Sequence, residues 1–240
     1  MPKLLNREAL GHTALRQTLL KIVEAGLLAI DTANITRKLI TITGASSLLI
    51  GGVPFLLKSG GKVYFLGVGK CASEVGKTVE TILGDRLTEG LAIDVCERGI
   101  VGKCVRYIGG THPYPSEKNV SASKKVVDFL KKATEDDLVI FAISGGGSTL
   151  LCLPTGTNTC VDEQILLRRL FAVGATIQEI NTVRKHISLV RGGQLARYAY
   201  PAKSVSLIFS DVPGNDLGFV ASGPTVKDKT SVKEAKLILQ

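Results

Sequence analysis

The chain has 240 residues, 45% of them hydrophobic and 21% charged, with a formal net charge of +9. This length and apolar content suffice for one large domain or two small ones with a buried core, so we expect an ordinary globular protein. The most apolar N-terminal run, LLKIVEAGLLAI, contains Lys21 and Glu24 and is too short to span a bilayer, which excludes a membrane segment there.

The first residues, MPKLLNREALGH, lack an apolar core and a small-residue cleavage site, so we predict a cytoplasmic protein. Lysine and arginine are spread along the chain and aromatic residues make up 5%, so we expect an anionic small molecule and not nucleic acid. Five cysteines without close pairing favour reduced thiols over a metal site or disulfides: Cys71, Cys96, Cys104, Cys152 and Cys160.

In chain order, apolar residues at helical spacing first predict an amphipathic helix over residues 13–31, which we expect to cover a sheet. After a glycine-rich break at IGGVPFLLKSGGK, the run KVYFLGVG predicts a strand and KCASEVGKTVETIL a helix. Two more strands are predicted at GLAIDVCE and CVRYIGG, followed by a helix over SEKNVSASKKVVDFLKKA that Ser116 caps.

The second half begins with the strand DLVIFAIS. Helices are predicted at DEQILLRRLFAV and, without interruption, at TIQEINTVRKHISLVRGGQLARYA, and SVSLIFSDV is a last buried strand. Short apolar strands that alternate with helices predict an α/β fold with a mostly parallel sheet covered on both faces. Ligands of such folds bind at the carboxyl ends of the strands, so the loops that leave those ends are candidate sites.

The loop GVGKCA, residues 67–72, matches the dinucleotide pattern G-x-G-x-x-A after a strand, and Glu97 could contact a ribose. Lys70 in this turn suits a phosphate or carboxylate better than hydride chemistry, and a plain tight turn with a surface lysine is the structural alternative. CASEVGKT resembles a Walker A loop, but Cys71 replaces its first glycine and Lys77 falls inside a helix, so we reject a P-loop.

Three consecutive glycines follow DLVIFAIS, where they suit neither a helix nor a strand. Their backbone N–H groups can converge on an anion, and the helix that STLL begins adds positive potential. Hydroxyl groups flank the glycines and add donors. We therefore predict a phosphate or carboxylate site formed by Ser144, Gly145, Gly146, Gly147, Ser148 and Thr149.

The segment SDVPGND follows the strand VSLIF and offers oxygen ligands from Asp211, Asn215 and Asp216. Mg²⁺ takes such ligands when it also binds substrate phosphates. Capping of the next helix explains the carboxylates equally well. The polar turn SGPT, residues 222–225, could line the same cleft.

Cations gather in NTVRKHISLVRGGQLA, where Arg184, Ser188 and Arg191 share one face of the expected helix and Lys185 is adjacent. They could position an anionic substrate, although a solvated basic face is the commoner arrangement. His186 we expect to pack or hydrogen-bond, and His112, in the rigid loop THPYP, could line a site or be structural.

Five motifs occur in one order: GVGKCA, GTHPYPSEKN, AISGGGSTLL, INTVRKHISLVRGGQLA and SDVPGNDLGFVASGPT. Together they resemble the type II glycerate kinase family, from the N-terminal helix to the last residue. The resemblance implies that residues 1–240 form a Rossmann-like α/β/α sandwich. It also implies that a C-terminal domain, named MOFRL, normally follows and closes the cleft, and that this domain is missing from the chain, which ends at AKLILQ.

Members of this family transfer the γ-phosphoryl group of ATP to D-glycerate, usually giving 2-phosphoglycerate. The lysine of the family's G-x-G-K-A turn is implicated in catalysis, and Lys70, beside Gly69, matches it, with Cys71 intervening before Ala72. An arginine of the second domain, also implicated, has no counterpart here. Phosphoryl transfer requires alignment and charge neutralisation, which Lys70, a glycine-rich anion site and Mg²⁺ can supply together.

Two alternatives stay open. The G-x-G-x-x-A match favours an NAD(P)H-dependent hydroxypyruvate reductase, and the missing domain favours a non-catalytic anion-binding fragment.

Overall fold

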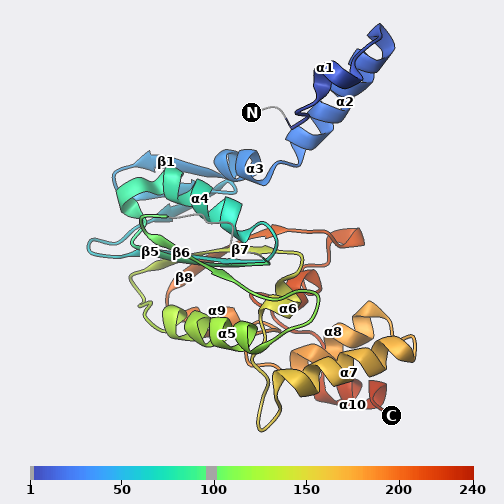
Figure 1. Cartoon of the computed structure of the whole chain (residues 1–240). Helices are drawn as coiled ribbons and strands as arrows, with labels where there is room; N and C mark the ends of the chain where they lie inside the picture. The colour runs from blue at the N-terminus through green and yellow to red at the C-terminus, as the bar shows by residue number, and fades with distance from the viewer. Residues whose placement is uncertain (1–2, 96–101) are drawn as a thin grey trace.

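The computed structural model describes residues 3–95 and 102–240. Within them, five parallel strands form a sheet in the order β6-β5-β4-β7-β8 (Figure 1). The strands are β4 (Val63–Val68), β5 (Glu89–Asp94), β6 (Val105–Gly109), β7 (Leu138–Ser144) and β8 (Lys203–Phe209). The predicted parallel sheet is confirmed, and the order reverses beside β4, so the ends of β4 and β7 form the point where such folds bind ligands.

Helices cover both faces of this sheet, as predicted (Figure 1). Strands β4 and β7 are buried along their whole length, which is why their sequences are almost uninterrupted apolar runs. One face packs against α4 (Ala72–Leu83), and the other packs against α5 (Glu117–Leu130) and α9 (Gln194–Ala199). Ser116 forms the predicted cap of α5, through a capping box with Asn119.

A third group of helices lies beyond the carboxyl edge of the sheet (Figure 1). It contains α7 (Cys160–Ala172), α8 (Ile177–His186) and α10 (Val232–Ile238). Their shared core is formed by Leu167, Leu170, Ile180 and Val183. Shorter elements near the same edge are α6 (Gly147–Leu150) and the 3₁₀ turns Pro213–Asn215 and Val220–Ser222, and a further 3₁₀ turn, Gly84–Arg86, follows α4.

The N-terminal helix forms close to its predicted bounds, but the expectation that it covers a sheet is wrong. The first elements are α1 (Arg7–Leu10), α2 (Ala14–Ala29) and α3 (Thr32–Leu39). Helix α2 projects away from the body, its side chains Leu15 and Ile22 are 70% and 63% exposed, and α3 packs on α4 instead (Figure 1). Periodicity reveals an apolar stripe, but it does not reveal what the stripe packs against. No helix of the described segments is long and apolar enough to cross a membrane.

A small antiparallel sheet before β4 was not predicted. It consists of β1 (Ile40–Gly44), β2 (Ser47–Ile50) and β3 (Val53–Leu56). Gly51 and Gly52, at φ 58° and 82°, form the two-residue turn between β2 and β3, and a Gly-Gly pair between apolar runs is a known hairpin signal. The glycines treated as a break are therefore a hairpin turn.

The long helix predicted over residues 176–199 is also wrong, because it is two helices. Helix α8 ends at His186 and α9 begins at Gln194. Between them the chain forms an antiparallel bridge from Ser188 to Pro154, and Gly192 and Gly193 adopt φ 58° and 85°. Positive φ angles end a helix, and the Gly-Gly pair was the available signal.

Candidate anion-binding site

The loops that leave β4 and β7 are joined to each other at the carboxyl edge of the sheet. The backbone N–H of Lys70 donates to the carbonyl of Gly145 at 3.0 Å, and the N–H of Cys71 donates to Ser144 Oγ at 3.3 Å. A side chain on Gly69, at φ 122°, would collide with Ser144. Gly69 is therefore required for the close approach of the two loops.

The glycine segment keeps three consecutive amide donors free. Gly146 has φ 84°, and the backbone N–H groups of Gly146, Gly147 and Ser148 have no protein acceptor within the described residues. The carbonyls of Gly146 and Gly147 are occupied, since they accept from the amides that follow in α6. Adjacent unpaired N–H groups in a glycine turn form a concavity of positive potential, which is suited to an anion. We call Gly146–Ser148 the amide nest.

The hydroxyl groups that were expected to assist the amides all have protein partners. Ser144 Oγ accepts from Cys71, Ser148 Oγ lies 2.8 Å from Ser222 Oγ, and Thr149 Oγ1 donates to the carbonyl of Pro113 at 3.1 Å. Phosphate binding by these hydroxyls stays a prediction. Among the described residues, the backbone amides of Gly146–Ser148 are donors that have no protein partner.

Two exposed side chains lie over the nest. A Cβ added to Gly146 would be 3.1 Å from Cγ and 3.2 Å from Cε of Lys70, and 3.5 Å from Cδ2 of His112. No ion pair occupies Lys70 among the described residues. Partial burial, with the charges of Lys70 and Arg184, lowers the pKa of His112 below its ordinary value of 6.5. Sequence reasoning had left the role of His112 open.

Of the three predicted metal ligands, the structure brings Asp211 to the nest. A Cβ on Gly145 would collide with the Asp211 carboxylate, so this group lies directly against the glycine turn. Asp216 instead accepts from the N–H of Gly218 at 2.8 Å, and Asn215 ends a short 3₁₀ turn. The described segments contain no cluster of three His, Cys, Asp or Glu side chains that could hold a metal by themselves. One carboxylate beside a phosphate site still fits Mg²⁺, which often takes one or two protein carboxylates together with substrate phosphates.

Arg184 and Arg191 lie beneath the nest and not on an accessible helix face. Both are buried, and both pair with the buried carboxylate of Glu163, at 3.0 and 2.7 Å. Their guanidinium groups also donate to the carbonyl of Ser148, at 2.7 Å from Arg184 Nη2 and at 3.0 and 2.6 Å from Arg191 Nε and Nη2. The expected shared helical face does not exist, because α8 ends before Arg191.

This buried cluster has two cations and one anion, so it leaves a positive charge under the amide nest. Burial and the neighbouring Arg191 lower the pKa of Arg184 to about 10, although Glu163 opposes this shift, so Arg184 stays protonated at neutral pH. Glu163 was missed because a glutamate in the first turn of a predicted helix has the pattern of an ordinary helix start. Lys185, the third predicted cation, forms a separate ion pair with Asp228 at 2.8 Å.

The turn that matches the dinucleotide pattern has no free amide to offer a pyrophosphate. The N–H groups of Gly69, Lys70, Cys71 and Ala72 each have a protein acceptor. The N–H of Ser73, in the first turn of α4, donates to the buried Asp94 carboxylate at 3.1 Å, so a protein anion already occupies the place where a phosphate would bind. Glu97, the expected ribose contact, lies outside the described residues, as does Cys96. The other four cysteines are free thiols.

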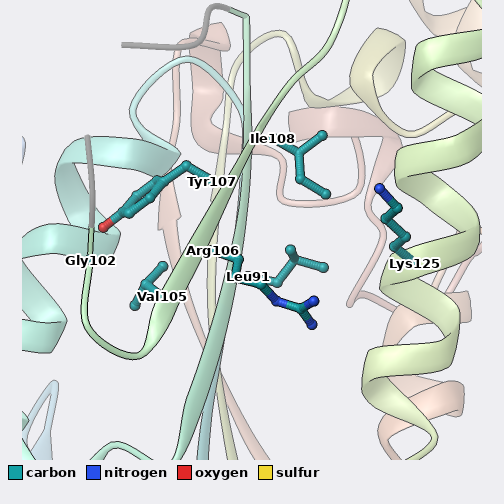
Figure 2. Close-up of a pocket in the computed structure, with 7 residues that line it drawn as sticks. All are labelled: Leu91, Gly102, Val105, Arg106, Tyr107, Ile108 and Lys125. Atoms are coloured by element: carbon teal, nitrogen blue, oxygen red, sulfur yellow. The ribbon is translucent and has the colours of Figure 1, made fainter. Parts of the chain in front are cut away.

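A separate pocket of about 410 Å³ lies along the edge strand β6. Figure 2 shows Ile108 and Arg106 of this strand opposite Lys125 of α5. None of the predicted site residues lines it.

Comparison with known proteins adds a family to this geometry. The model of a family described as a domain of unknown function, DUF4147, matches residues 18–240. The chain is similar to a glycerate 2-kinase of Pyrococcus horikoshii, with 37% identity over 94% of this chain and 50% of that protein. It is also similar to a putative hydroxypyruvate reductase of Agrobacterium vitis, with 40% identity over 75% of this chain and 41% of that protein.

A crystal structure of a protein from Pyrococcus horikoshii has the same fold, with a TM-score of 0.86 and 37% identity over 95% of this chain and 51% of the other. The chain spans about half the length of the curated relatives it matches.

Proposed function

The chain belongs to the DUF4147 family, and on that premise we propose that it holds the reacting phosphate in an ATP-dependent phosphorylation of D-glycerate, giving 2-phosphoglycerate. The observation that carries this proposal is the row of three amides at Gly146–Ser148 with the Lys70 cation above it, none of which has a partner in the part of the chain that the structure describes. The name of the Pyrococcus relative supports the choice of substrate.

The chemistry of phosphoryl transfer matches what these residues can do. The transferred group carries its negative charge on equatorial oxygens, so catalysis depends on fixed positive groups more than on a protein nucleophile. The amide nest supplies fixed N–H dipoles, Lys70 supplies a mobile full charge, and the buried Arg184–Arg191–Glu163 cluster adds one net charge from below. Donors that are fixed in advance stabilise the transition state without reorganisation.

Asp211 would hold Mg²⁺ at this site, since its carboxylate lies against Gly145, and Asn215 and Asp216 remain predicted ligands. When bound, the ion neutralises phosphate charge that Lys70 and the amides alone leave unbalanced. Phosphate contacts by Ser144 and Thr149 belong to the same proposal.

The relatives' greater length supports a second part of the protein that closes over the exposed side of the site. Lys70, His112 and Asp211 are all solvent-exposed in this chain, and water weakens charge interactions there. We expect the 240-residue chain to fold and to bind anions weakly, and we expect efficient turnover from the natural full-length protein.

Reduction of hydroxypyruvate with a nicotinamide cofactor is the second candidate, and the name of the Agrobacterium relative supports it. The occupied amides of residues 69–73 and the Asp94 carboxylate argue against a dinucleotide at the β4 turn. A coupled ADP-release assay with D-glycerate, run beside a nicotinamide absorbance assay with hydroxypyruvate, separates the two. We expect ADP release. Hydroxypyruvate-dependent oxidation of NADH without ADP release would refute the kinase proposal.

A further inference from the structure

The imidazole of His112 lies against the nest at Gly146, and the proposed function has given it no task. Its residue is exposed, its ring lies over Gly146 beside Lys70, and its two nitrogens have no hydrogen-bond partner within the described residues. A ring that the protein brings to an anion site without using its nitrogens is available to a ligand.

The loop that carries His112 is fixed on both sides of the ring. The buried side chain of Asn119 accepts from the N–H of Thr111 at 3.0 Å, and its amide group donates to the carbonyls of Thr111 and Thr149 at 2.9 Å each. On the other side, Thr149 Oγ1 donates to the carbonyl of Pro113 at 3.1 Å. Pro113 is therefore bonded directly to α6, the helix that begins in the nest, and Thr111 is linked to it through Asn119 of α5. Such supporting contacts hold a ring in place before a ligand arrives.

We propose that His112 accepts the proton of the D-glycerate hydroxyl that attacks ATP. This role rests on the proposed function. The hydroxyl oxygen forms a bond to the γ-phosphorus while the bond from that phosphorus to the β,γ-bridging oxygen breaks. The electron pair of the broken bond leaves with ADP, and the hydroxyl proton moves to a ring nitrogen of His112, which later releases it to water.

The charged groups around His112 favour the form that can accept a proton. Lys70, from the turn after β4, and Arg184, from α8, are the charges that act on the ring, and together with partial burial they lower the pKa of His112 below 6.5. The imidazole is therefore neutral at neutral pH. Because the neutral form is the active one, activity that depends on His112 is present above its pKa and is lost as the pH falls through it.

The test compares His112→Gln with His186→Gln in the natural full-length protein. Glutamine can form a hydrogen bond but cannot take a proton at neutral pH. His186 is the matched control, since its Nδ1 bonds to the Thr182 carbonyl at 2.9 Å within α8. We expect His112→Gln to lower kcat by about 10²–10⁴-fold with KM for D-glycerate changed little, and to remove the acidic limb of the pH profile. The His186→Gln control should keep the parent's kcat and the acidic limb of its pH profile.

A binding readout does not depend on turnover. In the NMR spectrum, adding D-glycerate should shift the ring resonances of His112, identified by their loss in the variant, and leave those of His186 in place. The absence of such a shift would overturn the proposal. So would a His112→Gln variant with unchanged kcat, or one in which only KM rises. A wild-type protein that does not phosphorylate D-glycerate would refute the proposed function and this role together, whereas an active wild type beside an unimpaired variant would refute this role alone.

Discussion

Replacing Glu163 by glutamine should destabilise the folded protein far more than the small change in side-chain size suggests. The Glu163 carboxylate is 1% exposed and accepts from Arg184 Nε and Nη2 at 3.1 and 3.0 Å and from Arg191 Nη2 at 2.7 Å. An amide removes the negative charge and turns an NH₂ group toward the two guanidiniums. Breaking a buried ion pair from one side costs about 3–5 kcal/mol, because the remaining charge is uncompensated. We expect a loss of that size in the free energy of unfolding, measured by urea denaturation at neutral pH.

The matched control is Glu179→Gln, at a partly exposed capping residue of α8, which should change stability little because glutamine can accept the same capping hydrogen bonds. Burial acts to raise the pKa of Glu163, but Arg191 and Arg184 outweigh it and hold the pKa below its ordinary value of 4.5. The stabilisation by the Glu163 carboxylate is therefore present above pH ~4.5 and is lost as the pH falls through the folded-state pKa. The free energies of unfolding of the parent and of Glu163→Gln should therefore converge in acid. A Glu163→Gln protein as stable at neutral pH as the control would refute the charge balance described here.

Three further predictions concern the site, each measured in the natural full-length protein. Lys70→Ala should lower kcat by about 10²-fold or more, because its charge acts in the transition state, and unchanged turnover would remove it from the mechanism. Gly146→Val should abolish phosphate binding measured by calorimetry. Gly156→Val should preserve it, since Gly156 also has a positive φ, 63°, but its Cβ would meet open space. Equal losses of binding in the two variants would attribute the effect to backbone strain alone. Asp211→Asn should raise the Mg²⁺ concentration for half-maximal activity and Asp216→Asn should raise it less, since Asp216 already caps Gly218; indistinguishable titrations for Asp211→Asn and the parent would disprove metal binding by Asp211.

The sheet could be predicted because its chemistry is local. Strands buried on both faces must be apolar throughout, so the runs at residues 63–68 and 138–144 could be recognised as strands. The candidate site was then expected in the loops at their carboxyl ends. The position of α2 could not be predicted in the same way, because an amphipathic pattern does not name its partner. The resemblance to glycerate kinases is confirmed by the family match and by the curated relatives.

Within the site, the glycine segment was found because three glycines have few structural uses, and its free amides agree with an anion site. The sequence analysis identified both arginines but placed them on one helical face, because it read the turn at Gly192 and Gly193, where both glycines have positive φ, as helix. Contacts between segments that are distant in the sequence could not be predicted. Glu163, in α7, pairs with Arg191 in the segment between α8 and α9, and the ring of His112 reaches Gly146 from a loop more than thirty residues earlier. No local sequence pattern records either contact.

The most direct test of the account follows the phosphoryl group itself. ATP labelled at its γ-phosphate is incubated with D-glycerate, Mg²⁺ and the natural full-length protein, and the products are separated and identified. The account predicts label in 2-phosphoglycerate, formed by the parent protein and by the Gly156→Val control but not by Gly146→Val. Label that stays in ATP with a folded parent protein, or transfer that survives in Gly146→Val, would contradict the claim that the amide nest holds the transferred phosphate.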